Sequence, residues 1–279
     1  MRELKAEAVT DAVRKMCEES NCVLPCDVRR SLDSALKSET WPQARDTLES
    51  LILNYEIAES EHVPICQDTG VACVFVELGQ EVHVIGDLGK AIDKGVRIGY
   101  REGYLRASLV ADPIRRVNTG DNTPAMIYYD IVPGDICRIT VAPKGFGSEN
   151  MSRTAMLLPS DGAAGVKAFV LRAVEEAGSN PCPPIIVGVG IGGTFDKAAL
   201  LSKKALLRPA DDRHPDPWYA AFEDELLEAV NALGIGPQGF GGRTTALAVK
   251  VLAMSTHIAG LPAAVNINCH VSRHMTVEL

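Results

Sequence analysis

The sequence predicts a mixed α/β (α+β) fold, with a helical N-terminal portion over residues 1–60 and a mixed α/β body over residues 61–279. Apolar residues recur every three or four positions through the first sixty residues, which is the period of an amphipathic helix. Beyond Cys66, short β-branched runs alternate with helical patterns, as in domains where helices cover a sheet. A chain of 279 residues with 46% hydrophobic content is long and apolar enough to bury such a core.

Each element is predicted from its own periodicity. Three apolar stripes predict helices in the N-terminal portion, at residues 9–17, 28–36 and 44–55. Seven short runs in the body predict strands, at 71–76, 82–85, 125–132, 136–142, 184–189, 245–254 and 262–268. Four longer stretches predict helices, at about 87–106, 163–177, 195–207 and 216–233. We expect one domain over residues 1–279, because the proline-rich stretch 208–218 is too short to establish a boundary.

The composition excludes several classes of partner. The net charge of −8 argues against nucleic acid, which attracts proteins with a basic surface. It does not exclude a small anionic substrate, because a local arginine cluster can overrule the global field. The charged N-terminus lacks the apolar core of a signal peptide, and no apolar run approaches the roughly 20 residues of a membrane span. We therefore expect a cytoplasmic protein.

The eight cysteines require a reason, because a cytoplasmic chain of this size does not need disulfides. Cys73 and Cys137 lie in strand-like runs, where cysteine behaves as a small hydrophobic residue of the core. Two sets of three could hold iron. One is local, with the spacing C-x4-C-x3-C: Cys17, Cys22 and Cys26. The other is dispersed among turns and strand ends: Cys66, Cys182 and Cys269. The residues alone favour the dispersed set only modestly, and leave open whether Cys66 is a structural thiol, a nucleophile or a metal ligand.

The segment VGVGIGG at residues 187–193 contains the pattern G-x-G-x-x-G between a predicted strand and a predicted helix, as dinucleotide-binding turns do. Such a site also needs an acidic residue after a second strand, but Asp211 and Asp212 lie in a proline-rich loop. We expect these glycines to let the backbone approach another segment or a ligand, with Thr194 capping the following helix.

Other glycine-rich loops carry polar side chains. KGFGSENMSR (144–153) and GIGPQGFGGRTT (234–245) offer backbone N–H groups that can bind anions, and each alone is equally consistent with a simple turn. Together with Arg106 and the segment 115–124 they supply donors suited to carboxylates.

The histidines give a weaker signal. His270 and His274 are four apart but have no matching pair of cysteines, so zinc is not favoured. The position of His257 at the end of an apolar strand is, by itself, more typical of a core residue.

Seven segments follow one another along the chain: ICQDTG, EGYLRAS, NTGDNTPA, GSENMS, VGVGIGGTFDKAALLSKKALLR, GFGGRTTALAV and THIAGLPAAVNINCH. Together they resemble the iron–sulfur hydro-lyases of the class I fumarase and L-tartrate dehydratase family. The resemblance covers nearly the whole chain and corresponds to the alpha subunit of two-chain members, or to the N-terminal domain of single-chain members. It implies that residues 1–279 form the alpha-subunit catalytic domain.

The resemblance implies a cofactor and a reaction. In that family three dispersed cysteines hold a [4Fe–4S] cluster, so Cys66, Cys182 and Cys269 are implied to be its ligands in this chain. Three thiolates leave one iron open, and an open iron can act as a Lewis acid. The implied reaction is the reversible dehydration of (S)-malate to fumarate, in which the iron stabilises the departing hydroxide while a base removes a proton from the adjacent carbon. L(+)-tartrate is the alternative substrate, and no residue here decides between them.

Three site residues are implied near the first cysteine and in YLRAS. Asp68 is implied to take part in proton transfer, and Gln67 to bind the substrate beside it. Arg106 is implied to clamp a substrate carboxylate, which suits the planar guanidinium.

Two more substrate contacts are implied elsewhere. Gly147, or alternatively Gly145, is implied to contact the substrate through its backbone. The choice stays open because the family commonly has a third glycine where this chain has Phe146. His257 is implied to bind the substrate and to be a catalytic residue, contrary to its isolated context.

The resemblance ends with NINCHVSRHMTVEL, where single-chain members continue into a second domain that supplies the proposed threonine base. It therefore implies a separate beta subunit, an assembly that is a dimer of alpha–beta pairs, and a contact face that is polar and rich in glycine. No nucleic acid or membrane partner is expected. Two other classes stay open: an electron-transfer protein whose cluster has a fourth ligand among the local cysteines, and a dinucleotide-dependent oxidoreductase.

Overall fold

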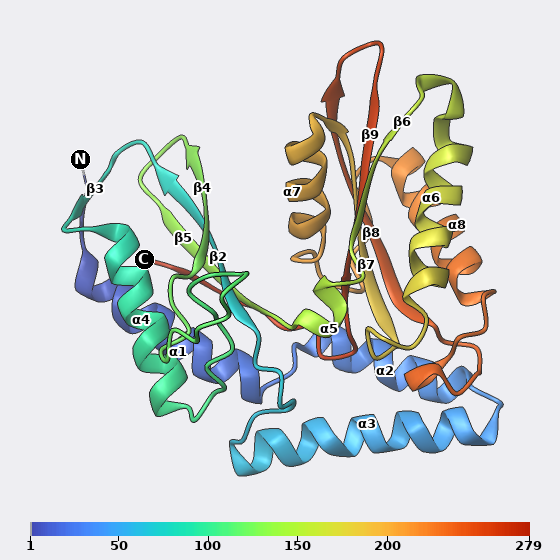
Figure 1. Ribbon diagram of the computed structural model, residues 1–279, viewed down its shortest axis with the longest axis horizontal. Helices are drawn as coiled ribbons and strands as arrows, with labels where there is room; N and C mark the ends of the chain where they lie inside the picture. Colours follow the sequence, from blue (N-terminus) through green and yellow to red (C-terminus); the bar gives the residue numbers. More distant parts are fainter. Residues whose placement is uncertain (1) are drawn as a thin grey trace. The chain divides into compact units, whose positions relative to one another are not determined.

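The computed structural model describes residues 2–279 and confirms the predicted mixed α/β fold. The chain divides into two compact units (Figure 1). Unit 1 comprises Met1–Leu24, Tyr55–Gly145 and Arg273–Leu279, and unit 2 comprises Pro25–Asn54 and Phe146–Ser272. The expectation of one functional domain over the whole chain stays a prediction.

The three predicted N-terminal helices are present as α1 (Ala6–Cys22), α2 (Cys26–Ser38) and α3 (Pro42–Glu61). Apolar residues at helical spacing form their buried faces, for example Val9 and Val13 of α1, both fully buried. These helices are shared between the units, since α1 belongs to unit 1 and α2 to unit 2.

Unit 1 is built on a four-stranded sheet with the order β10-β5-β2-β4. Its strands are β2 (Val71–Gly79), β4 (Met126–Val132), β5 (Cys137–Lys144) and β10 (Met275–Glu278). The central strand β2 is parallel to β4 and antiparallel to β5. Helix α4 (Leu88–Glu102) packs against α1 (Figure 1). Two short parallel strands, β1 (Arg2–Lys5) and β3 (Val82–Ile85), form a separate pair.

Two glycines allow the close packing of α1 and α4. A Cβ atom added to Gly95 would lie 2.7 Å from the carbonyl oxygen of Thr10, and one added to Gly99 would lie 2.7 Å from that of Arg14. Helix α4 has no side chain at these two positions, so the backbone of α1 can approach it closely. The apolar faces of both helices thereby pack together over the sheet.

Unit 2 contains a second four-stranded sheet with the order β6-β9-β7-β8. Its strands are β6 (Arg153–Leu157), β7 (Ile185–Gly193), β8 (Ala246–Thr256) and β9 (Leu261–Asn268). Helix α7 (Phe195–Ala205) covers one face of this sheet, and α6 (Gly162–Ala177) and α8 (Pro217–Asn231) cover the other (Figure 1). The strand β7 is parallel to β8 and antiparallel to β9, so the start of β7 and the end of β9 lie side by side at the same end of the sheet.

The glycine run 187–193 lies inside β7 and does not form a strand-to-helix loop. A Cβ atom added to Gly188 or Gly190 would lie 2.1 Å from a carbonyl oxygen of α7, that of Ser202 or Ala198 respectively. The glycines therefore let the backbone of β7 approach α7, as the sequence predicted, and do not cradle a phosphate. Thr194 is at the N-cap position of α7, but its hydroxyl bonds to the Asp196 carboxylate instead of capping the backbone.

The sequence prediction missed three short strands, β1, β6 and β10, and the one-turn helix α5 (Phe146–Glu149). It also extended α4 too far, because Gly103 ends this helix and Tyr104 has a positive φ of 52°. Arg106 consequently lies in a loop. No helix within residues 2–279 combines the length and the apolar character needed to span a bilayer.

Candidate active site

The segment 64–70 is a tight loop between α3 and β2 in unit 1. The backbone N–H of Gly70 donates to Asp68 Oδ1 at 3.1 Å, and the backbone N–H of Asp68 lies 3.4 Å from Cys66 Sγ. Gly70 has a φ of 72°, and an added Cβ would lie 2.6 Å from the backbone of Lys144. This turn is therefore open only to glycine, and it presents Cys66 half-buried beside an exposed Gln67.

Two buried side chains hold this loop against the rest of unit 1 through hydrogen bonds. The Tyr100 hydroxyl lies 2.8 Å from the carbonyl oxygen of Thr69 and 3.0 Å from that of Gly70. Asn122 Nδ2 donates to the same Gly70 carbonyl at 3.1 Å, while its Oδ1 accepts from the backbone N–H of Ser108 and of Leu109. Burial raises the pKa of Tyr100 well above its ordinary value, so this hydroxyl stays a neutral donor. Sequence reasoning named neither residue; Asn122 lies within the motif NTGDNTPA, whereas Tyr100 precedes EGYLRAS and lies in none of the motifs.

Thr69 connects the loop to Arg106. The backbone N–H of Arg106 donates to Thr69 Oγ1 at 2.9 Å across 37 residues of sequence, and the guanidinium remains exposed. Gly145 approaches from β5, where an added Cβ would lie 3.1 Å from Asp68 Oδ2. Unit 1 thus brings together Cys66, Gln67, Asp68 and Arg106 of the predicted site, and it also places Gly145 against the Asp68 carboxylate.

Unit 2 brings Cys182 and Cys269 together at one edge of its sheet. Ile186 of β7 pairs with Asn268 of β9, so Cys182 precedes β7 and Cys269 follows β9 at the same end. His270 holds the two segments together, since its Nδ1 lies 2.9 Å from the Cys182 carbonyl oxygen. Cys182 is exposed, with a positive φ of 54°.

Gly147 lies exposed in α5 of unit 2. Two polar contacts anchor this turn through Glu149: Lys203 Nζ is 2.6 Å from Glu149 Oε1, and Asn266 Nδ2 donates to Glu149 Oε2 at 2.9 Å. Three of the sequence motifs therefore meet at this turn. Lys203 of LLSKK in α7 and Asn266 of NIN in β9 both bind Glu149 of GSEN, and they fix the turn that carries Gly147.

His257 lies in the turn between β8 and β9, exposed to solvent and outside the core. It lines a cavity of about 360 Å³ with Trp218 and Phe222. The strand β9 spans eight residues and rises about 3.3 Å per residue, so its two ends lie about 25 Å apart. His257 precedes β9 and Cys269 follows it. Within unit 2 the structure therefore does not bring His257 to the cysteine pair.

A family model described as Fumarate hydratase (Fumerase) matches residues 10–278. The chain belongs to this family. It is 43% identical over 271 residues to a Methanocaldococcus jannaschii protein provisionally named L(+)-tartrate dehydratase subunit alpha, with 95% of each chain covered. It is 34% identical over 258 residues to the L(+)-tartrate dehydratase subunit alpha of Escherichia coli (strain K12), which covers 91% of this chain and 85% of the relative. The resemblance inferred from the motifs is confirmed, and the chain is an alpha-type subunit of the hydro-lyases of the fumarate hydratase family.

The thiols of this family member fall into two chemical groups. Cys17 and Cys137 are fully buried, and burial raises the pKa of both. Burial, with the charge of Glu18, also raises the pKa of Cys22. A thiol of this kind does not readily give the thiolate that binds iron. Cys17 and Cys22 of the local set are therefore poor iron ligands, whereas Cys26 is exposed and the dispersed cysteines are exposed or half-buried.

No three His, Cys, Asp or Glu side chains within residues 2–279 are grouped as ligands of a single metal ion. This arrangement is compatible with cysteines that each ligate a different iron of a cluster, since such thiolates need not converge on one point. The donor chemistry fits: an N–H group faces Cys66 Sγ, and Cys182 and Cys269 have accessible thiols at one sheet edge.

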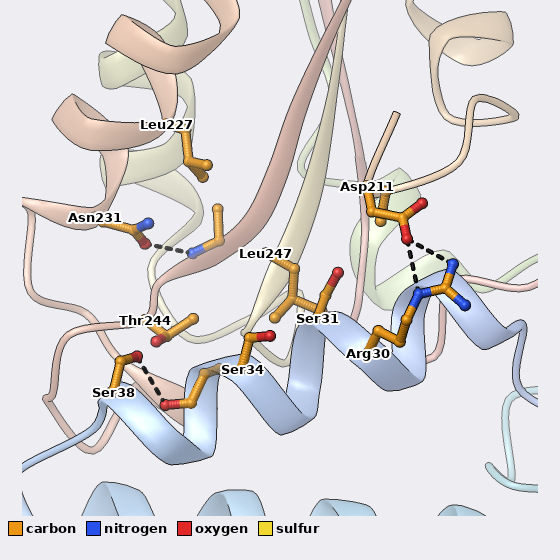
Figure 2. A pocket seen from close by; sticks show the side chains of 12 residues that line it. Arg30, Ser31, Ser34, Ser38, Asp211, Leu227, Asn231, Thr244 and Leu247 are labelled. Carbon is orange, nitrogen blue, oxygen red and sulfur yellow. Dashed lines mark hydrogen bonds and ion pairs between the residues drawn. The ribbon is translucent and has the colours of Figure 1, made fainter. Parts of the chain in front are cut away.

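A further cavity of about 510 Å³ lies in unit 2 among α2, α8 and the start of β8. Figure 2 shows the ion pair of Arg30 and Asp211 at one side of it, with Ser34 and Thr244 on its wall. Neither Cys182 nor Cys269 lines this cavity. It is not the candidate active site.

Proposed function

We propose that this chain is the alpha subunit of a [4Fe–4S] hydro-lyase that reversibly dehydrates (S)-malate to fumarate. The supporting observation is the arrangement around Thr69, which holds Cys66, Asp68 and Arg106 in one part of unit 1. A thiol, a carboxylate and a guanidinium are the three kinds of group that this reaction needs: a metal ligand, a proton carrier and a carboxylate clamp.

The proposed cluster ligands are Cys66, Cys182 and Cys269. When bound, the cluster supplies Lewis acidity at the iron that has no protein thiolate. The chain's own contribution is to keep these thiols available. The Asp68 N–H faces Cys66 Sγ at 3.4 Å, and Cys182 is exposed in the turn before β7.

The remaining proposed residues bind substrate and move a proton. Arg106 binds one substrate carboxylate through its exposed guanidinium, in two parallel hydrogen bonds. Gln67, exposed beside Cys66, donates a hydrogen bond to the substrate. Asp68 accepts or returns a proton at the reacting centre. The backbone contact is assigned to Gly147, and Gly145 remains its alternative because it lies against Asp68.

L(+)-tartrate is the second candidate substrate, since relatives 34–43% identical to this chain are named for it. Malate and tartrate are both four-carbon 2-hydroxy dicarboxylates, so the same arginine clamp serves both. The test is turnover of malate, fumarate and L(+)-tartrate by anaerobically reconstituted enzyme with its partner subunit. We expect the highest kcat/KM for the malate–fumarate pair. Preference for tartrate would assign the second function, and no turnover of any of them would refute the proposal.

A beta subunit is the proposed partner, because the relatives carry the name subunit alpha. In this proposal the beta chain supplies the base that removes the carbon-bound proton, and the assembly is a dimer of alpha–beta pairs. His257 is retained as a substrate-binding residue. Since it lies a strand length from Cys269 in its own chain, its contact would be made to the site of the other alpha chain.

A further inference from the structure

Arg273 is a buried cation that forms no ion pair among residues 2–279. It begins the C-terminal segment of unit 1, and only 4% of its surface is exposed. Its Nη2 donates to the backbone carbonyl of Asp68 at 2.6 Å, and its buried Nε has no hydrogen-bond partner. Within residues 2–279 it forms no ion pair with a carboxylate.

This arrangement is costly unless another negative charge is present. Arginine stays protonated in proteins, and burying a charge without a compensating partner is strongly unfavourable. A neutral carbonyl offsets little of that cost. The charge of Arg273 also lowers the pKa of Cys22 and of Tyr100, although burial raises both by more. Arg273 therefore lies close enough to Cys22 and Tyr100 to act on both electrostatically.

The hydrogen bond from Arg273 acts on Asp68, the residue whose N–H faces Cys66 Sγ. By fixing the carbonyl of Asp68, it orients the same residue whose N–H faces Cys66 Sγ and whose Oδ1 accepts from Gly70. Tyr100 and Asn122 hold the other end of the turn. Removing Arg273 would release the cysteine end of the loop and leave the glycine end fastened.

We propose that Arg273 is a positioning residue for the cysteine loop and the counter-cation of the negative charge that the site acquires with its thiolates and cluster. The inference rests on the proposed function, since it is the cluster-loaded site that provides the missing negative charge. It assigns Arg273 no contact with the substrate.

The test compares Arg273→Met, Arg273→Lys and the exposed control Arg101→Met in the full alpha chain with its partner. Iron and sulfide content, the cluster midpoint potential and the rate of cluster loss to a chelator are measured, together with melting of the cluster-free chain. In R273M we expect cluster retention to fall by about 10- to 100-fold, as for other residues that support metal ligands. Its midpoint potential should become more negative, because a nearby positive charge favours the reduced cluster. R273K should recover part of both effects, and R101M should match the wild type.

The melting measurement separates this role from a purely structural one. Replacing an unbalanced buried charge with an apolar side chain of similar length is often neutral or stabilising, so cluster-free R273M should melt no lower than the wild type. A clearly lower melting temperature of cluster-free R273M would show that Arg273 is simply part of the fold. Equal cluster retention in R273M and wild type would refute the inference alone. A wild-type chain that takes up no cluster would instead refute the proposed function.

Discussion

At the scale of single residues, Thr69 determines where the substrate clamp lies. It is 2% exposed, and its Oγ1 accepts the backbone N–H of Arg106 at 2.9 Å. In Thr69→Val that N–H loses its acceptor, which costs about 1–3 kcal/mol, and the loop carrying Arg106 is released. We expect KM for malate to rise by about tenfold or more, since 1.4 kcal/mol corresponds to a factor of ten. Thr69→Ser keeps the oxygen and should stay near the wild type. A T69V enzyme with unchanged KM would show that Arg106 is positioned by other contacts.

The cysteines allow a direct comparison of ligand and non-ligand thiols. Serine at Cys66, Cys182 or Cys269 should abolish or severely weaken the cluster absorbance at roughly 400 nm, because thiolates hold iron–sulfur clusters. Cys26 is the matched control: it is exposed, belongs to the local set and lies at the start of α2. Cys26→Ser should load a full cluster. A full cluster with normal turnover in Cys182→Ser, or loss of the cluster in Cys26→Ser, would contradict the ligand assignment.

At the scale of elements, Glu39 ties the end of α2 to the loop before β8. Only 2% of it is exposed, and it accepts the backbone N–H groups of Thr40, Trp41 and Arg243. Burial opposes its ionisation, but these hydrogen bonds prevail and lower the pKa of Glu39. A lowered carboxyl pKa adds stability that is present at neutral pH and is lost as the pH falls through the folded-state pKa.

The Glu39→Gln variant should therefore lose about 1–3 kcal/mol of unfolding free energy at pH 7. The difference from wild type should narrow as the pH falls below about 4.3, the ordinary glutamate pKa. Denaturant unfolding at several pH values measures this. Glu49→Gln, at an exposed position of α3, is the control and should change stability by no more than about 0.5 kcal/mol. A pH-independent gap for E39Q would mean that packing, and not ionisation, is responsible.

The strand β7 and helix α7 form a contact that depends on glycine. A Cβ on Gly190 would overlap the carbonyl oxygen of Ala198, so Gly190→Ala must push α7 off the sheet. We expect a loss of about 1–3 kcal/mol or more in thermal or denaturant unfolding. Gly89→Ala, in the first turn of α4 where an added Cβ meets nothing closer than 3.6 Å, should be neutral or slightly stabilising. Full stability of G190A would show that α7 is not packed as closely as the structure has it.

The long elements could be predicted from sequence because each has its own apolar periodicity. The strands β1, β6 and β10 could not, because they are short, pair with distant partners and contain fewer β-branched residues than the similarly short β3 (VHVI). The same reason applies to the site. The motifs identified Cys66 and Arg106, but their proximity depends on a hydrogen bond from Arg106 to Thr69 across 37 residues. The resemblance also placed His257 among the substrate residues, whereas the length of β9 that separates it from Cys269 appears only in the folded strand.

At the scale of the whole molecule, the proposed chemistry is divided between two chains. This chain offers thiols, an arginine clamp and Asp68, and the proposed beta chain offers the base that removes the carbon-bound proton. Proton removal and stabilisation of the leaving group must act together on one bound substrate.

A positioned acid or base contributes about 10²- to 10⁴-fold to the rate. We therefore expect the reconstituted alpha chain alone to be at least about 100-fold less active in fumarate hydration than the alpha–beta complex, even when it holds a full cluster. Activity is measured before and after the beta chain is added, with the cluster content fixed by iron analysis. A cluster-free alpha chain with added beta chain is the control for the cofactor. Equal activity with and without the beta chain would mean that the base lies within these 279 residues.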